Sequence, residues 1–350
     1  MTIEWLAGNR IRGTTAERPN ASLQSPSVGG WVEVGRTTLG SAGDNIDITS
    51  LPDKRYYMYL LHRDTSGSTS ARMTFNGDDA SSNQNYSTRY ASDGTEYTAI
   101  NQDYVSQHTS ASQDSFTCGY IANKSSNEKL VQSWIVGNAS PPSRYEQFWK
   151  WDNTSNAINR IDIFNHLSGD FASGSELVVL GWDPADTHTT NFWEELASVE
   201  LSSASDDISS GTFTAKKYLW IQGYIKQDES TASNMRMQFN SDTGSNYAER
   251  QSTNGGSDTT GVSADHIPTS DGGKFGNFFN AFIINNSSNE KLAIIHGTSV
   301  NTEGAGTAPT RREIVGRWAN TSSQITSCRI FRTVGGQYQS GTILKVWGAN

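Results

Sequence analysis

Matched carboxylates are the first residues to weigh for chemistry, because enzymes that hydrolyse polysaccharides use two Asp or Glu side chains that face each other. Three acidic positions occur twice in the chain: Glu33 and Glu195, Asp44 and Asp206, Glu128 and Glu290. The two glutamates of the last pair each precede a lysine in a polar segment, which is typical of a solvated turn. The two aspartates lie in loop sequence, where an Asx turn accounts for them. The carboxylates therefore do not predict a glycosidase.

The other residue types that catalyse reactions form no known motif. The chain has no phosphate-binding loop, no dinucleotide-binding glycine pattern and no zinc-ligand spacing. No serine lies in a Gly-x-Ser-x-Gly turn. The six histidines are scattered, and none recurs at a matched position: His62, His108, His166, His188, His266 and His296. We therefore expect a protein that is not an enzyme.

Two matched loops carry the oxygen donors that calcium prefers. Residues 76–79 follow Phe75, and residues 240–244 follow Phe239; both segments are rich in Asn, Asp and Gly. Calcium takes about six to eight oxygen ligands. The spacing is not that of an EF-hand, and a turn without an ion is the favoured interpretation. We therefore expect no cofactor, with calcium at these two loops as the one alternative.

Tryptophans are the candidates for a contact surface. Two of them are duplicated, Trp31 as Trp193 and Trp151 as Trp318. Exposed indoles could stack on sugars or pack on a neighbouring subunit, but duplication at fixed places favours the core. Trp149 has no counterpart, because its matched position is Gly316. We therefore predict that Trp149 makes a surface contact that is specific to one domain.

These matched positions belong to a repeat that spans most of the chain. Residues 30–182 recur, diverged, in residues 192–350, and the hexapeptide 125–130 returns unchanged at 287–292. A unit of this length is a whole domain, because solenoid and propeller units run about 20–50 residues. The 350 residues thus divide into an N-terminal arm and linker (1–29), a first domain (30–184) and a second domain (185–350).

Within each copy the hydrophobic pattern has the period of β-strands. Residues 235–239 alternate strictly, and the aromatic-rich runs 55–61 and 217–221 suit central strands. Apolar runs at 278–284 and 292–295 flank a polar tip, which predicts a hairpin. About eight short strands per copy, with turn signals roughly every ten residues, are typical of an antiparallel sandwich. We predict an all-β protein of two tandem jelly-roll-like sandwiches with an extended N-terminal arm.

Composition narrows the class of partner. The net charge is −9, so broad electrostatic binding to nucleic acid or an anionic membrane is not expected. Cys118 and Cys328 are not at matched positions, so we expect two free thiols in a reducing cytoplasm, with a single bridge between the domains as the alternative. The sequence shows neither a signal peptide nor an apolar run of membrane-spanning length, and we expect a soluble protein.

The chain carries one resemblance. Residues 8–19, Gly-Asn-Arg-Ile-Arg-Gly-Thr-Thr-Ala-Glu-Arg-Pro, resemble the opening of many uncharacterised virion structural proteins of marine tailed viruses. The domain pattern is similar to repeats in the same proteins, with Trp-x-Glu at Trp31, Lys-Arg-Tyr at Lys54, Phe-Asn at Phe75 and Asn-Glu-Lys-Leu at Asn127. The resemblance implies a non-enzymatic role on the virion, after folding in the host cytoplasm: a capsid decoration protein, a head fibre or a tail-associated protein.

Under this resemblance, the N-terminal arm would bind other virion proteins. Arg10, Arg12 and Arg18 are cations of the arm that could lie against an acidic capsid surface. Each exposed ion pair contributes less than about 1 kcal/mol, so firm attachment needs multivalency, such as a homo-oligomeric trimer on a symmetric site. The alternative is a glycan- or receptor-binding adhesin with exposed Trp or Tyr in a groove.

Overall fold

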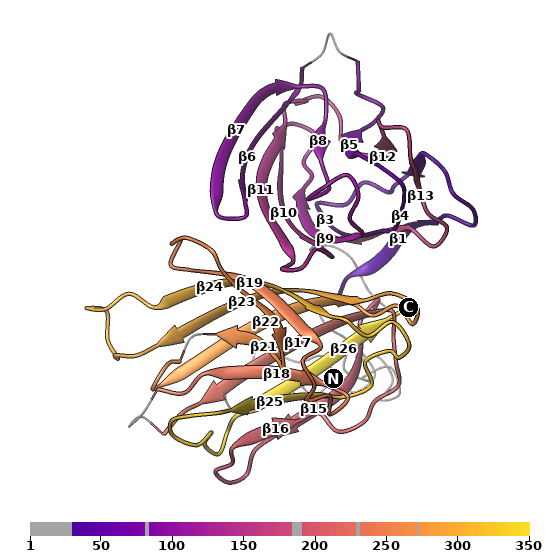
Figure 1. Ribbon diagram of the computed structural model, residues 1–350. Helices are drawn as coiled ribbons and strands as arrows, with labels where there is room; N and C mark the ends of the chain where they lie inside the picture. The colour runs from indigo at the N-terminus through magenta and orange to yellow at the C-terminus, as the bar shows by residue number, and fades with distance from the viewer. Residues whose placement is uncertain (1–29, 81–83, 184–190, 229–231, 271) are drawn as a thin grey trace, which may run out of the picture.

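The computed structural model describes residues 30–80, 84–183, 191–228, 232–270 and 272–350. All of its regular secondary structure is β-strand, arranged in two sandwiches (Figure 1). The predicted N-terminal arm and the predicted boundary between residues 184 and 185 lie outside the described residues. Within those five ranges, no helix has the length and hydrophobicity to cross a membrane.

The first sandwich consists of a large and a small antiparallel sheet, with a two-stranded ribbon beside them. In spatial order the large sheet contains β1 (Val32–Thr38), β14 (Glu176–Trp182), β3 (Tyr56–Arg63), β9 (Ser115–Ala122), β10 (Lys129–Gly137), β11 (Ser143–Trp151), β6 (Tyr86–Ser92) and β7 (Thr95–Gln102). The small sheet contains β2 (Asn45–Ile48), β12 (Ile161–Asn165), β5 (Ala71–Phe75) and β8 (Val105–Ser106). The ribbon pairs β4 (Thr65–Ser66) with β13 (Asp170–Phe171).

The large and small sheets of the second sandwich repeat this order strand for strand, and the two-stranded ribbon has no counterpart among the described strands. Its large sheet contains β15 (Glu194–Glu200), β26 (Ile343–Ala349), β17 (Tyr218–Lys226), β22 (Gly276–Ile284), β23 (Lys291–Val300), β24 (Thr310–Trp318), β19 (Tyr247–Thr253) and β20 (Thr259–Ala264). Its small sheet contains β16 (Asp207–Ser209), β25 (Cys328–Arg332), β18 (Met235–Phe239) and β21 (Ile267–Ser270). The chain alternates between the two sheets in both domains, so the prediction of tandem antiparallel sandwiches is confirmed.

The number of strands differs from the prediction. About eight strands per copy were expected, which is the size of each large sheet alone. Strands of the small sheets are only two to five residues long, and so short a run gives little periodicity to detect. Both cysteines are buried free thiols, as predicted.

The repeated hexapeptide combines an exposed turn at its start with a buried lysine, Lys129 in the first copy. Lys129 is fully buried, and its ammonium group donates to the carbonyl oxygens of Asn127 (3.0 Å) and Asn153 (2.7 Å). It also lies 5.4 Å from the ring centroid of Trp151. The Trp151 indole N–H in turn donates to Asp78 (2.6 Å). The lysine therefore ties the hairpin tip to β11 and to the loop after β5.

The second domain contains the same device. Lys291 donates to the carbonyl oxygens of Asn289 (2.9 Å) and Asn320 (2.7 Å), and the Trp318 indole donates to Asp242 (2.7 Å). A buried ammonium group needs such acceptors, because burial without partners is costly. The duplicated tryptophans at these positions belong to the core, as predicted: Trp151 and Trp318 are each 1% exposed.

Trp149 lies in the core of the first domain, so the prediction of a surface contact is wrong. Its side chain is 3% exposed and stacks on Phe75, with ring centroids 5.1 Å apart. The second domain fills the matched space differently. A Cβ at Gly316 would lie 2.7 Å from Ile267, whose counterpart in the first domain is the smaller Val105. Trp149 lacks a counterpart because the first domain has a large side chain on the large sheet facing a small one on the small sheet, and the second domain has the reverse.

We expect Trp149→Ala to destabilise the first domain by about 3–5 kcal/mol, because it leaves a large cavity against Phe75. The neighbouring Lys150→Ala should change the free energy of unfolding by less than about 0.5 kcal/mol, since Lys150 points away from the core and is 41% exposed. Urea unfolding followed by tryptophan fluorescence and circular dichroism measures both. A loss below about 1 kcal/mol in Trp149→Ala would contradict the core assignment.

Candidate functional surfaces

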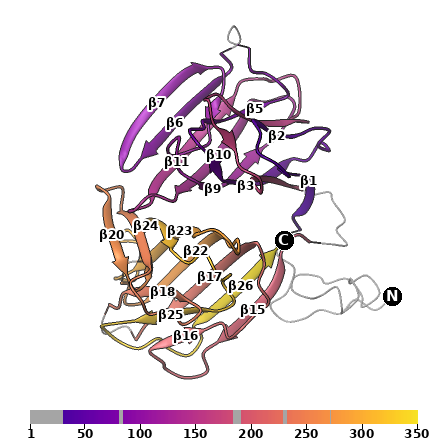
Figure 2. The ribbon, with the colours of Figure 1, turned by 45° about the vertical axis from the view of Figure 1, so that its right-hand side comes forward.

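The two domains bind each other through the outer faces of their large sheets. Figure 2 shows β9 and β10 of the first domain next to β22 and β23 of the second. Apolar side chains from both sheets form a third core between the domains. From the first domain it contains Met58, Leu60, Phe116, Cys118, Val136, Val178 and Leu180; from the second it contains Trp193, Tyr218, Phe282, Ile284, Leu292, Ile294, Val315, Trp347 and Ala349. We call this contact the domain joint.

The joint uses different halves of the two equivalent sheets. In the first domain it involves the later part of β3, around Leu60, whereas in the second domain it involves the start of β17, at Tyr218. Tyr218 matches Tyr56 in strand register, and Leu292 matches Leu130. The half-face that is covered in the second domain is therefore the half-face that remains uncovered in the first.

A buried carboxylate fixes one side of the joint. Glu176 on β14 accepts hydrogen bonds from Tyr218 (2.6 Å) of the second domain and from Thr38 and Arg36 (2.9 Å) of its own domain. The ammonium group of Lys217 lies 3.0 Å away. Burial opposes ionisation, but these donors and cations outweigh it and lower the pKa of Glu176 to about 2. The carboxylate is thus ionised and ties the domains together at neutral pH.

An arginine cluster fixes the other side. Arg144 of the first domain contacts Asp258 (2.6 Å) and Glu313 (3.4 Å) of the second, and Glu146 (2.8 Å) of its own. Burial raises the pKa of Glu146 to about 7, and the nearby Glu313 adds to the effect against the opposing charge of Arg144. Two carboxylates, one with a raised pKa, are a feature of glycosidases. Here both are nearly buried, at 12% and 13% exposed, and both are held by Arg144, so we assign them to the joint.

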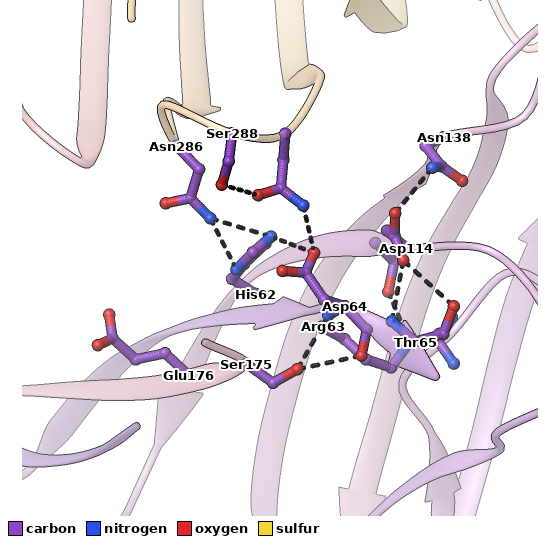
Figure 3. A network of polar contacts seen from close by, with 12 residues as sticks. His62, Arg63, Asp64, Thr65, Asp114, Asn138, Ser175, Glu176, Asn286 and Ser288 are labelled. Atoms are coloured by element: carbon purple, nitrogen blue, oxygen red, sulfur yellow. Dashed lines mark hydrogen bonds and ion pairs between the residues drawn. The ribbon is translucent and has the colours of Figure 1, made fainter. Parts of the chain in front are cut away.

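A hairpin tip of the second domain completes the contact. Figure 3 shows the tip between β22 and β23 above the end of β3. Asn286 lies 3.2 Å from Nδ1 of His62, and Asn289 donates to Asp64 (2.9 Å), which also contacts His62 (3.0 Å). This tip carries the second copy of the repeated hexapeptide. The first copy, between β9 and β10, has no such contact with the other domain among the bonds of the described residues.

The uncovered half of the large sheet in the first domain is apolar, and we call it the open half-face. It consists of Tyr56, Tyr120, Leu130, Phe148 and Ile100 with the edge residues Trp31, Trp182, Gln132, Lys150 and Arg89. Ile100, Leu130 and Phe148 are 62%, 59% and 51% exposed. The Tyr56 and Trp182 rings stack with centroids 5.3 Å apart. Two hollows of about 420 Å³ each lie along this surface. Contiguous exposed apolar surface of this kind marks binding sites.

The second domain has a hollow of different character at the opposite end of its large sheet. It measures about 630 Å³ and is lined by Tyr224, Phe278 and Phe275 together with the polar side chains of Thr298 and Glu303. Tyr224 and Phe278 are 47% and 43% exposed. Aromatic faces beside hydrogen-bonding groups suit ligands with both apolar and polar surfaces, such as sugars.

The carboxylates singled out in the sequence serve local contacts in the structure. Five of them pair with a cation of their own domain: Glu33 with Arg36, Glu195 with Lys345, Asp206 with Arg332, Glu128 with Lys150 and Glu290 with Arg317. Asp44 accepts a hydrogen bond from Asn165 (2.9 Å). Most of these carboxylates thus contribute to surface ion pairs and turns, whereas Glu290 lies at the edge of the joint, because its partner Arg317 also donates to the carbonyl oxygen of Asn138 in the first domain (2.9 Å).

The remaining predicted site residues divide into two groups. Arg10, Arg12 and Arg18 lie outside the described residues. In the loops after Phe75 and Phe239, Asp78 and Asp242 accept the indole hydrogen bonds described above. Among the described residues, no group of three or more His, Cys, Asp or Glu side chains is placed to hold a metal ion. The expectation of no cofactor, with calcium at these loops as the alternative, stays a prediction.

Sequence reasoning missed both candidate surfaces. One signal could have indicated them: the run from Tyr56 to Leu61 is apolar at successive positions, which predicts a strand covered on both faces rather than on one. A position-by-position comparison of the two copies would then have shown that Leu130 recurs as Leu292 on the outer face. Which of these two is exposed could not be read from the sequence.

Comparison with known proteins gives little further guidance. No family model matches the chain, and no curated protein matches it. Among solved structures, the chain is similar to domains LG4–5 of the mouse laminin alpha1 chain, with 10% sequence identity over 91% of this chain and 89% of that chain. The TM-score is 0.19, so this likeness adds nothing to the fold described above.

The raised pKa of Glu146 predicts a pH-dependent joint. The pKa of Glu146 in the folded state, about 7, lies above the ordinary value of 4.5. Between pH 4.5 and pH 7 the folded state therefore binds more protons than the unfolded state, so the free energy of unfolding falls as the pH rises through this range. Glu146→Gln mimics the neutral form. We expect it to stabilise the protein by on the order of 2 kcal/mol at pH 8 and to be neutral near pH 4.5.

Urea unfolding at the two pH values measures this effect. Glu128→Gln is the matched control, because Glu128 is 41% exposed and pairs with Lys150 at the surface. The control should change the free energy of unfolding by less than about 0.5 kcal/mol at either pH. Destabilisation of Glu146→Gln at pH 8 would show that the charged form is the one the joint requires.

Proposed function

We propose that this protein is a non-enzymatic structural component of a virus particle, such as a capsid decoration, head-fibre or tail-associated protein. The observation that carries the proposal is the domain joint. Apolar side chains of two large sheets and two buried ion clusters hold the sandwiches together as one body. A fixed pair of domains suits a part that must present its surfaces at a constant distance and orientation.

The residues that recur in both copies support the same proposal. Lys129 with Trp151 and Lys291 with Trp318 are used to close hairpins and hold loops. Repetition in this chain thus preserves a folding device. The resemblance of residues 8–19 to virion proteins supplies the particle context, and the arm is the segment proposed to attach the protein.

Deletion of residues 1–29 tests this division of roles. We expect the truncated protein to keep its circular dichroism spectrum and thermal midpoint, because the described sandwiches make their own cores. We expect it to be absent from purified particles. The matched variant Arg10→Ala/Arg12→Ala/Arg18→Ala should weaken incorporation, relative to the unchanged protein, more at 0.1 M than at 0.3 M salt, since screening at the higher salt already removes much of the attraction that the arginines supply. Full incorporation of the truncated protein would refute attachment by the arm.

A second candidate function is glycan binding, and the hollow on the second domain favours it. Tyr224 and Phe278 offer exposed ring faces next to Thr298 and Glu303. Aromatic side chains beside hydrogen-bonding groups are the combination that sugar recognition uses.

A glycan array with the whole chain tests this candidate. Any sugar that binds should bind at least about tenfold more weakly to Tyr224→Ala, which loses one stacking face. Val262→Ala, elsewhere on the second domain and 52% exposed, is the matched control and should leave the affinity unchanged. An array without hits, or equal losses in the two variants, would remove this candidate.

A further inference from the structure

The joint inside the chain shows what covers one half of the large sheet. In the second domain, the half-face around Tyr218 and Leu292 is buried by the large sheet of the first domain. In the first domain, Tyr56 and Leu130 occupy the same register positions and belong to the open half-face. One fold therefore has the same half-face covered by a sheet in one copy and uncovered in the other.

The open half-face keeps the chemistry of its covered counterpart. Its side chains match those of the joint in character and register: Tyr56 with Tyr218, Tyr120 with Phe282, Leu130 with Leu292, Phe148 with Val315, Lys150 with Arg317 and Arg89 with Arg250. It is also continuous with the joint, because Trp31 and Tyr120 pack against the edge of the core between the domains. This surface is therefore suited to bind a sheet face.

If the contact of the joint were repeated between chains, the open half-face of one chain would bind the half of the large sheet that stays uncovered in the second domain of another chain. That contact is heterologous, and a heterologous contact that does not close builds filaments. Four of the seven apolar positions that the joint uses in the first domain are polar in the second domain: Leu60, Cys118, Val136 and Val178 are matched by Gln222, Asn280, Thr298 and Lys345. Each replacement is polar, so head-to-tail growth is disfavoured. The apolar surface that best matches the open half-face is then the open half-face of another chain.

We propose that the open half-face of the first domain binds the same half-face of a second copy of this chain. The contact is isologous and closes after two copies, which places two first domains at the centre and two second domains at the ends. Its edge carries both signs of charge, since Lys150 and Glu128 lie 2.8 Å apart, and a self-complementary surface needs both. The proposal rests on the sheets and is independent of the arm and of the particle.

The mass of the full-length protein in solution tests the dimer. We expect multi-angle light scattering and sedimentation equilibrium to give twice the chain mass of 38.2 kDa. The variant Leu130→Asp/Phe148→Asp should weaken the dimer about a hundredfold or more, because a two-fold contact includes each substitution twice. Both side chains are more than half exposed in the single chain, so the variant should keep the thermal midpoint of the monomer.

Two controls separate this contact from its rivals. Phe278→Asp alters the exposed hollow of the second domain and should leave the dimer intact. Deletion of residues 1–29 should also leave it intact, so that loss of particle attachment and loss of the dimer are distinguishable.

Four results would overturn the proposal. The first is a wild-type monomer at about 0.1 mM, a concentration at which even weak specific interfaces associate. The second is a mass three times that of the chain. The third is a dimer that survives Leu130→Asp/Phe148→Asp, and the fourth is association that is lost in Phe278→Asp or in the arm deletion. A glycan whose binding requires Leu130 in a monomeric protein would likewise assign the open half-face to sugar instead.

Discussion

The central strands of each large sheet are apolar on both faces, and this constraint organises the whole molecule. One face packs on the small sheet of its own domain, and water cannot solvate the other at low cost. The chain covers half of that second face in each domain by stacking the two sheets on each other. The layers therefore follow the order small, large, large, small, and the polar groups at the edges of the joint must find partners there.

The charged groups of the joint follow from the same burial. Glu176 and Arg144 lie where water is displaced, so each is surrounded by several partners rather than by one. Buried charges with incomplete partners would cost several kcal/mol. The two sites respond to burial in opposite ways. Cations and hydroxyl donors keep Glu176 ionised, whereas Glu146 shares its arginine with Glu313 and has a raised pKa.

The two copies differ in their outer surfaces and in the sizes of matched core side chains more than in their fold. The lysine–tryptophan–aspartate device is kept in both domains because it closes the same hairpin on the same loop. The outer faces have changed according to what covers them, with Leu60 inside the joint and its match Gln222 outside it. The large apolar residues that remain exposed on the first domain are an exception to this trend, and an exception of this kind indicates a partner.

The sequence by itself determined the all-β class, the duplication and the length of the repeat, because strand periodicity and matched residues are local or linear properties. It also placed Trp151 and Trp318 in the core. It could not place Trp149, because the space that receives its ring is set by Val105 on another strand and another sheet. Lys129 looked solvated for the same reason, since the acceptor at the shortest distance, the carbonyl oxygen of Asn153, comes from a segment more than twenty residues away. Which half of each large sheet is covered was decided only by the tertiary structure. Equivalent strands in the two domains have the same local pattern, and only the offset with which the sheets stack distinguishes the buried half-face from the open one.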